Sequence, residues 1–232
     1  MDFLNLTPAE ISAMTLSLRV SGWAVALSLP AGILAAWVLS RKRFPGKRLL
    51  DGVIHLPLVL PPVVIGYLLL VTCGKNGMIG SFLYQHLGIT LAFTWKGAVL
   101  AAAVMSFPLM VRAIRLSMDA VDQNIEAAAR TLGAGPARVF FTITLPLALP
   151  GVITGTVLAF ARSLGEFGAT IMFVSNIPGQ TQTLPLALYT FTQIPGGEQG
   201  AMRLCVIAIV IAMGALLCSD FLARTYTARL NG

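Results

Sequence analysis

The sequence predicts an all-α membrane protein, a polytopic helical bundle with about five transmembrane helices. Three observations support this fold class. The 232 residues are 56% hydrophobic and only 11% charged, with a mean hydropathy of +0.83, which is too apolar for a soluble globular domain. The apolar residues gather in long runs, and the basic residues lie between alternate runs rather than on one solvated domain.

Five apolar runs approach or exceed the roughly 20 residues that a helix needs to cross ~30 Å of hydrocarbon. They cover residues 12–40, 50–72, 97–111, 144–174 and 201–222. The third is the shortest, because Pro108, Arg112 and Arg115 are expected to close it early, and a buried half-span is its alternative. We treat residues 1–232 as a single transmembrane domain.

The Lys and Arg residues predict the orientation of the spans, since cytoplasmic loops carry an excess of basic residues. Three segments are basic, and they hold Arg41, Lys42, Arg43, Lys47 and Arg48, then Arg112, Arg115, Arg130 and Arg138, and finally Arg224 and Arg229. The alternate loops hold only Lys75 and Lys96. We therefore expect the N-terminus outside and the C-terminus in the cytoplasm. This distribution accounts for the net charge of +7 without a nucleic-acid partner.

The chain offers little for chemistry of its own. Its nine acidic residues are scattered, His55 and His86 stand alone, and the three cysteines form no Cys-x-x-Cys pair, so we expect neither a catalytic site nor a metal site. No G-x-x-x-x-G-K-[S/T] loop is present, so ATP, if used, is hydrolysed on another polypeptide. The first eleven residues lack Lys and Arg, so we expect the first span to be kept rather than cleaved as a signal peptide.

The loop at residues 119–142, between the third and fourth runs, predicts a short amphipathic helix. Asp122 is a candidate N-cap, and the apolar residues after it recur at helical spacing as Ile125, Ala128 and Leu132. One alternative places this helix on the bilayer surface. Its small side chains favour the other, in which the helix docks closely into a groove of a partner protein.

A glycine-rich turn follows this helix. Gly133 and Gly135 suit a helix C-terminus, and Pro136 suits the first turn of the next helix, which carries Val139 and Phe140 into the membrane.

This loop resembles the EAA loop of bacterial ABC importer permeases. The resemblance lies in "AAARTL", in Gly133, and in "ITLP" after nine further residues. It implies an ABC importer permease fold in the bacterial inner membrane, with a helix that couples to a cytoplasmic ATP-binding subunit through Asp122, Glu126, Ala128, Leu132 and Gly133. When the family pattern is aligned on Gly133, its glutamate falls on Ala127, whereas this chain has Glu126.

Across nearly the whole chain the resemblance narrows to the molybdate permeases among oxyanion importers. It is carried by "FPGKRLLDGVIHLPLVLPPVVIGYLLL", "GAVLAAAVMSFPLMVRAIRL" and "LAFARSLGEFGATIMFVSNIPGQTQTLPLALYTFTQIPGGE". It implies import of molybdate by a homodimer of this chain, with two copies of an ATPase that holds the ATP and a periplasmic molybdate-binding protein. A sulfate, thiosulfate or tungstate permease is the nearest alternative, because "ARSLGEFGA" is also similar to sulfate permeases. A passive anion channel is a further alternative, which would need no coupling helix.

Prolines in the second and fourth runs predict bent helices beside a central cavity, since proline cannot donate to the helical ladder. They are Pro57, Pro61, Pro62, Pro146 and Pro150. Static kinks that serve packing alone are the alternative. Of these residues, Pro61 and Pro62 are candidates for the anion pathway or its gate.

Arg162 and Glu166 are the other pathway candidates, since charges within a span usually face a partner or a cavity. They lie four residues apart, so they could instead pair with each other. Gly151, Gly155 and Ala159 share a face that permits close helix approach, either at a dimer axis or within one subunit. The segment 184–194 is too short to span.

Overall fold

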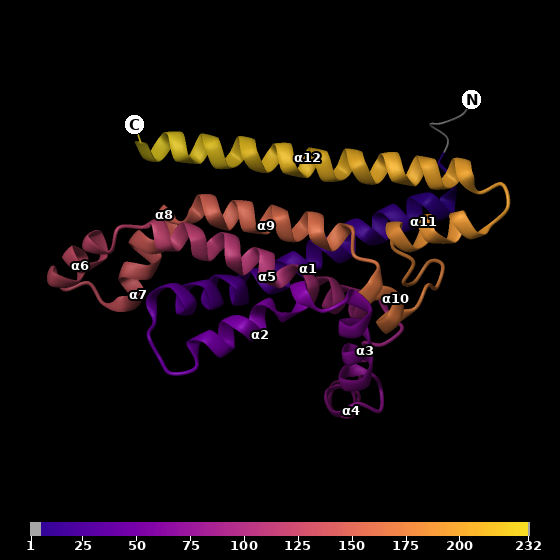
Figure 1. The fold of residues 1–232 in the computed structure, drawn as a ribbon, viewed down its shortest axis with the longest axis horizontal. Coiled ribbons are helices and arrows are strands. Elements are labelled where there is room, and N and C mark those ends of the chain that lie inside the picture. The colour runs from indigo at the N-terminus through magenta and orange to yellow at the C-terminus, as the bar shows by residue number, and fades with distance from the viewer. Residues whose placement is uncertain (1–5, 232) are drawn as a thin grey trace.

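The computed structural model describes residues 6–231, except for the side chains of residues 219, 220 and 222–231, and its described elements are all helices (Figure 1). The expected outer end at residues 1–5 and the side chains of Arg224 and Arg229, predicted to be cytoplasmic, lie outside the described residues. Three helices are long and apolar enough to cross a membrane: α1 (Pro8–Arg41), α5 (Trp95–Ala120) and α12 (Glu198–Asn231), of which Glu198–Cys218 passes this test.

Two further spans are bent pairs of helices. The α2 helix (Lys47–Val59) meets α3 (Pro62–Cys73) at 113°, and the segment Pro136–Leu147 meets α9 (Leu149–Leu164) at 69°. If each pair is one span, the total is five, as predicted. The breaks fall at Leu60–Pro61 and at Ala148, beside prolines that cannot continue the ladder of hydrogen bonds, so the expected bends are confirmed.

The α5 helix corrects one prediction. It runs unbroken for 26 residues through Pro108, so neither the early end nor the half-span alternative holds. The physical reason is packing: α5 lies between α1 and α9, and 61% of its most apolar window is buried. Pro108 has no N–H to donate, so one hydrogen bond of the helix is missing, and the contacts with both neighbours offset this loss. Arg115 then bonds with Asp51 at 3.0 Å, at the end of the helix.

The fourth predicted run is divided more than the sequence indicated. The helices begin before the run, in α7 (Pro136–Val139) and a π-helical turn, η1 (Phe140–Thr144), and the run itself passes from the end of η1 through α8 (Leu145–Leu147) to α9. The α9 helix ends at Leu164, and α10 (Gly168–Val174) follows after a three-residue break. The prolines predicted a bend near the start of this run, but not the second break before α10, and Glu166 lies in that break rather than one helical turn beyond Arg162.

The glycine face of α9 packs inside the same subunit, which settles the choice that the sequence left open. A Cβ added at Gly155 would lie 2.9 Å from the carbonyl oxygen of Met110 on α5, and one at Gly151 would clash with Ser117. The α12 helix lies along the outer side of α9 (Figure 1). The short helix α11 (Leu184–Gln193) packs on α12 and α1, as expected for a segment too short to span. The small helix α4 (Met78–Leu87) follows α3.

Candidate functional site

The helix α6 (Gln123–Thr131) forms in the predicted loop, at one end of the bundle (Figure 1). Its N-cap is Asp122, whose side chain accepts a hydrogen bond from the Asn124 N–H at 2.8 Å. At the other end, Gly133 adopts a left-handed conformation with φ of 85°. The N–H of Ala134 then donates to the carbonyl of Ala129 at 3.0 Å, which closes a Schellman cap. The predicted start and stop of this helix are confirmed.

The predicted apolar row of α6 faces outward from the subunit. Leu132 is 88% exposed and Ile125 is 48% exposed, and Ala128 is exposed between them. This exposure is costly in water for the two large side chains, because Ile125 and Leu132 each forgo about 1.5–3 kcal/mol of burial. Such a row fits contact with another protein or with the bilayer surface, the two alternatives that the sequence left open.

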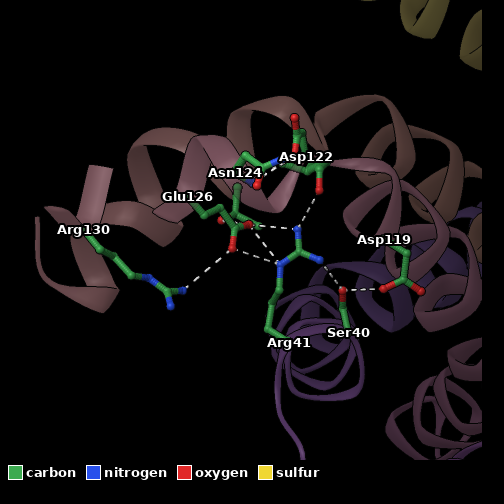
Figure 2. A network of polar contacts seen from close by, with 9 residues as sticks. Ser40, Arg41, Asp119, Asp122, Asn124, Glu126 and Arg130 are labelled. Atoms are coloured by element: carbon green, nitrogen blue, oxygen red, sulfur yellow. Dashed lines mark hydrogen bonds and ion pairs between the residues drawn. The ribbon is translucent and has the colours of Figure 1, made fainter. Parts of the chain in front are cut away.

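Glu126 lies on the opposite, buried face of α6 and is only 4% exposed (Figure 2). Its carboxylate accepts three hydrogen bonds from Arg41 at the end of α1. Oε1 accepts from Nη2 at 2.8 Å and from Nε at 2.9 Å, and Oε2 accepts from Nε at 3.1 Å. The carboxylate also accepts one from the Thr144 hydroxyl at 2.8 Å. Arg130 on α6 approaches it at 3.8 Å. The carboxylate thus joins three elements, α6, α1 and η1, and is placed to anchor the helix rather than to present itself to a partner.

Arg41 is itself held by hydrogen bonds to the end of α5 and to the adjacent Ser40. Its Nη2 donates to the carbonyl of Val121 at 3.3 Å, and its Nη1 donates to the Ser40 hydroxyl at 3.0 Å. That hydroxyl donates to Asp119 at 2.5 Å (Figure 2). The side chains of Arg41 and Glu126 are 7% and 5% exposed, so this is a buried ion pair, where a bidentate guanidinium has the geometry to offset the desolvation of both charges.

Sequence reasoning missed Arg41 and Thr144 as parts of this site. Arg41 stood in a cluster of five basic residues and was interpreted only as a sign of orientation. Thr144 carried no signal, since a threonine in an apolar run usually bonds its own helix. The π-helical turn brings Thr144 next to α6, and such turns occur often at functional sites.

The pathway candidates gather at a second place, where the break between α2 and α3 meets the break between α9 and α10. Arg162 Nη1 lies 2.6 Å from Glu166 Oε2 as an ion pair without hydrogen-bond alignment, and Glu166 Oε1 accepts from the Ala169 N–H at 2.8 Å. Glu166 therefore caps α10 while it neutralises Arg162. Across the break, a Cβ added at Gly168 would lie 2.8 Å from Cβ of Pro62, the residue after Pro61 at the start of α3.

The break between α2 and α3 is therefore in direct contact with the break between α9 and α10. On the next turn of α3, a Cβ at Gly66 would lie 2.6 Å from the carbonyl oxygen of Ala169 on α10. Only glycine allows this approach of two backbones. The structure thus brings Pro61, Pro62, Arg162 and Glu166 into one region, while the coupling residues lie apart from it at the end of the bundle.

The chain belongs to the family of inner membrane components of binding-protein-dependent transport systems, whose family model matches residues 28–232. A bacterial ABC transporter involved in the import of the acidic polysaccharide alginate has the same fold, with a TM-score of 0.75 at 16% identity over 95% of this chain and 80% of that one.

Two curated relatives are far more similar to this chain in sequence than that transporter is. The chain is 69% identical to the molybdenum transport system permease protein of Escherichia coli (strain K12), over 94% of this chain and 96% of the relative. It is 61% identical to the protein of the same description from Haemophilus influenzae, over 96% of this chain and 97% of that relative.

Proposed function

We propose that this chain is the permease subunit of an ATP-driven importer that carries molybdate from the periplasm to the cytoplasm. The observation that carries the proposal is α6, whose apolar row is exposed while its opposite face is fixed to two other elements by Glu126. A passive channel has no use for such a helix. The high identity to two molybdenum transport permeases over nearly their full length supports molybdate as the cargo.

The proposed importer contains two copies of this chain, two copies of a cytoplasmic ATP-binding subunit, and a periplasmic molybdate-binding protein. In this assembly the N-terminus is periplasmic, the C-terminus is cytoplasmic, and membrane lipid surrounds the spans. ATP is bound and hydrolysed on the partner, and this chain supplies the pathway. The basic residues at the α6 end of the bundle support this orientation, because Arg41, Arg130 and Arg138 all lie there.

The α6 helix is the proposed point at which ATP-driven movement enters the subunit. Movement of the ATP-binding subunits would displace the row of Ile125, Ala128 and Leu132. Because the Arg41–Glu126 pair links α6 to the end of α1, and Thr144 links it to the segment that leads into α9, that displacement passes to two spans at once. A rigid polar link transmits a shift of this kind better than a flexible loop does.

The contact between the two breaks is the proposed gate region. Bent helices leave backbone carbonyls free, which is tolerated at membrane depth only inside protein or beside water. Arg162 is 28% exposed and already paired with Glu166, so it offers a passing oxyanion a partly neutralised charge. Weak attraction of this kind suits a pathway that must release its cargo.

The test is uptake of labelled molybdate into proteoliposomes that hold this chain with its ATP-binding subunit and binding protein. We expect ATP-dependent uptake that resists excess sulfate. Leu132→Asp should abolish it, whereas Gln123→Asp, at an exposed polar position of the same helix, should leave it unchanged. If excess sulfate abolished uptake, the cargo would be a broader class of oxyanions rather than molybdate alone. Uptake indifferent to ATP would overturn the coupling role of α6.

A further inference from the structure

An open apolar groove runs along the interface of α1 and α5, away from both sites described above. Its larger part is a cavity of ≈ 570 Å³ whose walls include Trp23 and Leu27 on α1 and Val99 and Leu100 on α5. A second cavity of ≈ 350 Å³ continues it toward α2. The two share Ser28 and Ala103 in their linings, so they form one continuous groove.

Only one end of the groove is charged, and that charge is positive. Lys96 lines the groove at the start of α5. Trp95, the residue before it, also lines the groove, and the Arg19 guanidinium lies 3.9 Å from the centre of the Trp95 ring. Both Arg19 and Lys96 are exposed. No acidic residue lines either cavity within the described part of the chain. The groove therefore combines a long apolar trough with a cationic, tryptophan-flanked end, the arrangement found where a helix leaves the hydrocarbon.

The length of the groove matches one leaflet of a bilayer. Lys96 at the charged end and Phe107 at the far end are eleven residues apart on α5. At 1.5 Å per residue this is about 16 Å along the helix. Half of a hydrocarbon core of ~30 Å is about 15 Å. A lipid chain whose headgroup sits beside Lys96 would therefore end close to Phe107.

We propose that this groove binds one acyl chain of an anionic phospholipid, with its phosphate held between Lys96 and Arg19. A helix from a second copy of this chain is the competing occupant, but it would need a free carboxylate to complement the cations. Among the described carboxylates, Asp122 caps α6, and five are ion-paired within the subunit, namely Glu10, Asp51, Asp119, Glu126 and Glu166. Glu198, exposed in the first turn of α12, would have to supply the carboxylate, and the cross-linking arm of the test below distinguishes this occupant from a lipid. The proposed orientation of the chain decides only which leaflet supplies the lipid, and it places the groove in the outer leaflet. The rest of the proposal does not depend on it.

The test is photolabelling of the full chain in nanodiscs of phosphatidylcholine that contain phosphatidylglycerol with a diazirine in its acyl chain. Labelled peptides are quantified by mass spectrometry, and the exposed apolar face of α12, at Ile209 and Val210, reports ordinary contact with bulk lipid. We expect the 97–107 segment to be labelled several-fold more than this face, and unlabelled phosphatidylglycerol to compete.

The matched variants are Lys96→Gln and Lys75→Gln, which remove the same charge from the two basic positions of the predicted outer loops. Lys96→Gln should raise the phosphatidylglycerol concentration for half-maximal labelling about fivefold, the effect of one lysine at an anionic lipid surface. Lys75→Gln should not. Equal labelling of α5 and α12, or equal effects of the two variants, would overturn the proposal. So would efficient disulfide cross-linking of two copies through Leu100→Cys. None of these readouts involves transport, so their failure leaves the proposed function standing.

Discussion

The buried ion pair between Arg41 and Glu126 should control whether α6 stays fixed to the bundle. We consider Arg41→Met, which removes the guanidinium and keeps most of the side-chain volume. The Glu126 carboxylate left behind, now 5% exposed, would lose its three hydrogen bonds from Arg41, at 2.8, 2.9 and 3.1 Å. Only the Thr144 hydroxyl, at 2.8 Å, and Arg130, at 3.8 Å, would remain near it.

The expected magnitude follows from burial. Removing one partner of a buried ion pair costs about 3–5 kcal/mol, because the other charge stays desolvated and uncompensated. Since each 1.4 kcal/mol is a factor of ten, even the lower limit increases local opening of α6 by about 100-fold. Arg130→Met is the matched control. Arg130 is 58% exposed, and an exposed ion pair is worth about 0–1 kcal/mol, so opening should increase less than about tenfold.

Hydrogen exchange of the α6 backbone amides, residues 123–131, measures this opening directly, and molybdate uptake measures its consequence. Arg41→Met should lower amide protection of α6 by at least about 100-fold and reduce uptake in parallel. The double variant Arg41→Met, Glu126→Leu replaces both charges with apolar groups, which is often neutral for a buried pair. It should therefore recover most of the lost protection.

Two results would refute this reasoning. If Arg41→Met and Arg130→Met lowered α6 protection equally, burial of the pair would not set its energy. If the double variant lost as much protection as the sum of the two single variants, the charges would contribute independently and no coupling between them would exist.

Three further predictions rest on single positions. Gly133→Val forces a β-branched residue to a φ of 85°, so the cap of α6 should lose about 1–2 kcal/mol, seen as faster exchange of its last amides and lower uptake. Gly155→Val should lower the melting temperature of the purified chain, because its side chain would press on the α5 backbone at 2.9 Å at a cost of about 1–3 kcal/mol, whereas Gly22→Val meets nothing within 4 Å and should change it far less. Arg162→Ala should impair uptake more than Arg162→Ala with Glu166→Ala does, if pairing is the main role of Arg162. Equal impairment would instead favour a direct role for Arg162 toward the anion.

The sequence was sufficient for the fold class, the number of spans and the ends of α6. Each of these depends on local physical chemistry. Apolar runs separate from water whatever their neighbours are, proline bends a helix wherever it lies, and an aspartate cap or a left-handed glycine acts within one turn. For the same reason the exposed row of Ile125, Ala128 and Leu132 could be located from spacing alone.

Spacing already indicated the local pair of Arg162 and Glu166, but the tertiary structure alone decided which charges meet between different helices. Arg41 and Glu126 are 85 residues apart, and no local pattern separates Arg41 from the basic residues beside it. Packing between α1 and α9 likewise carries α5 past Pro108, where the sequence predicted an end. The close contacts of Gly66 and Gly168 depend on how α3 and α10, each just after a break in the chain, fit together. Long-range contacts of this kind depend on the whole arrangement of helices, because each requires two segments to be positioned at once by everything packed around them.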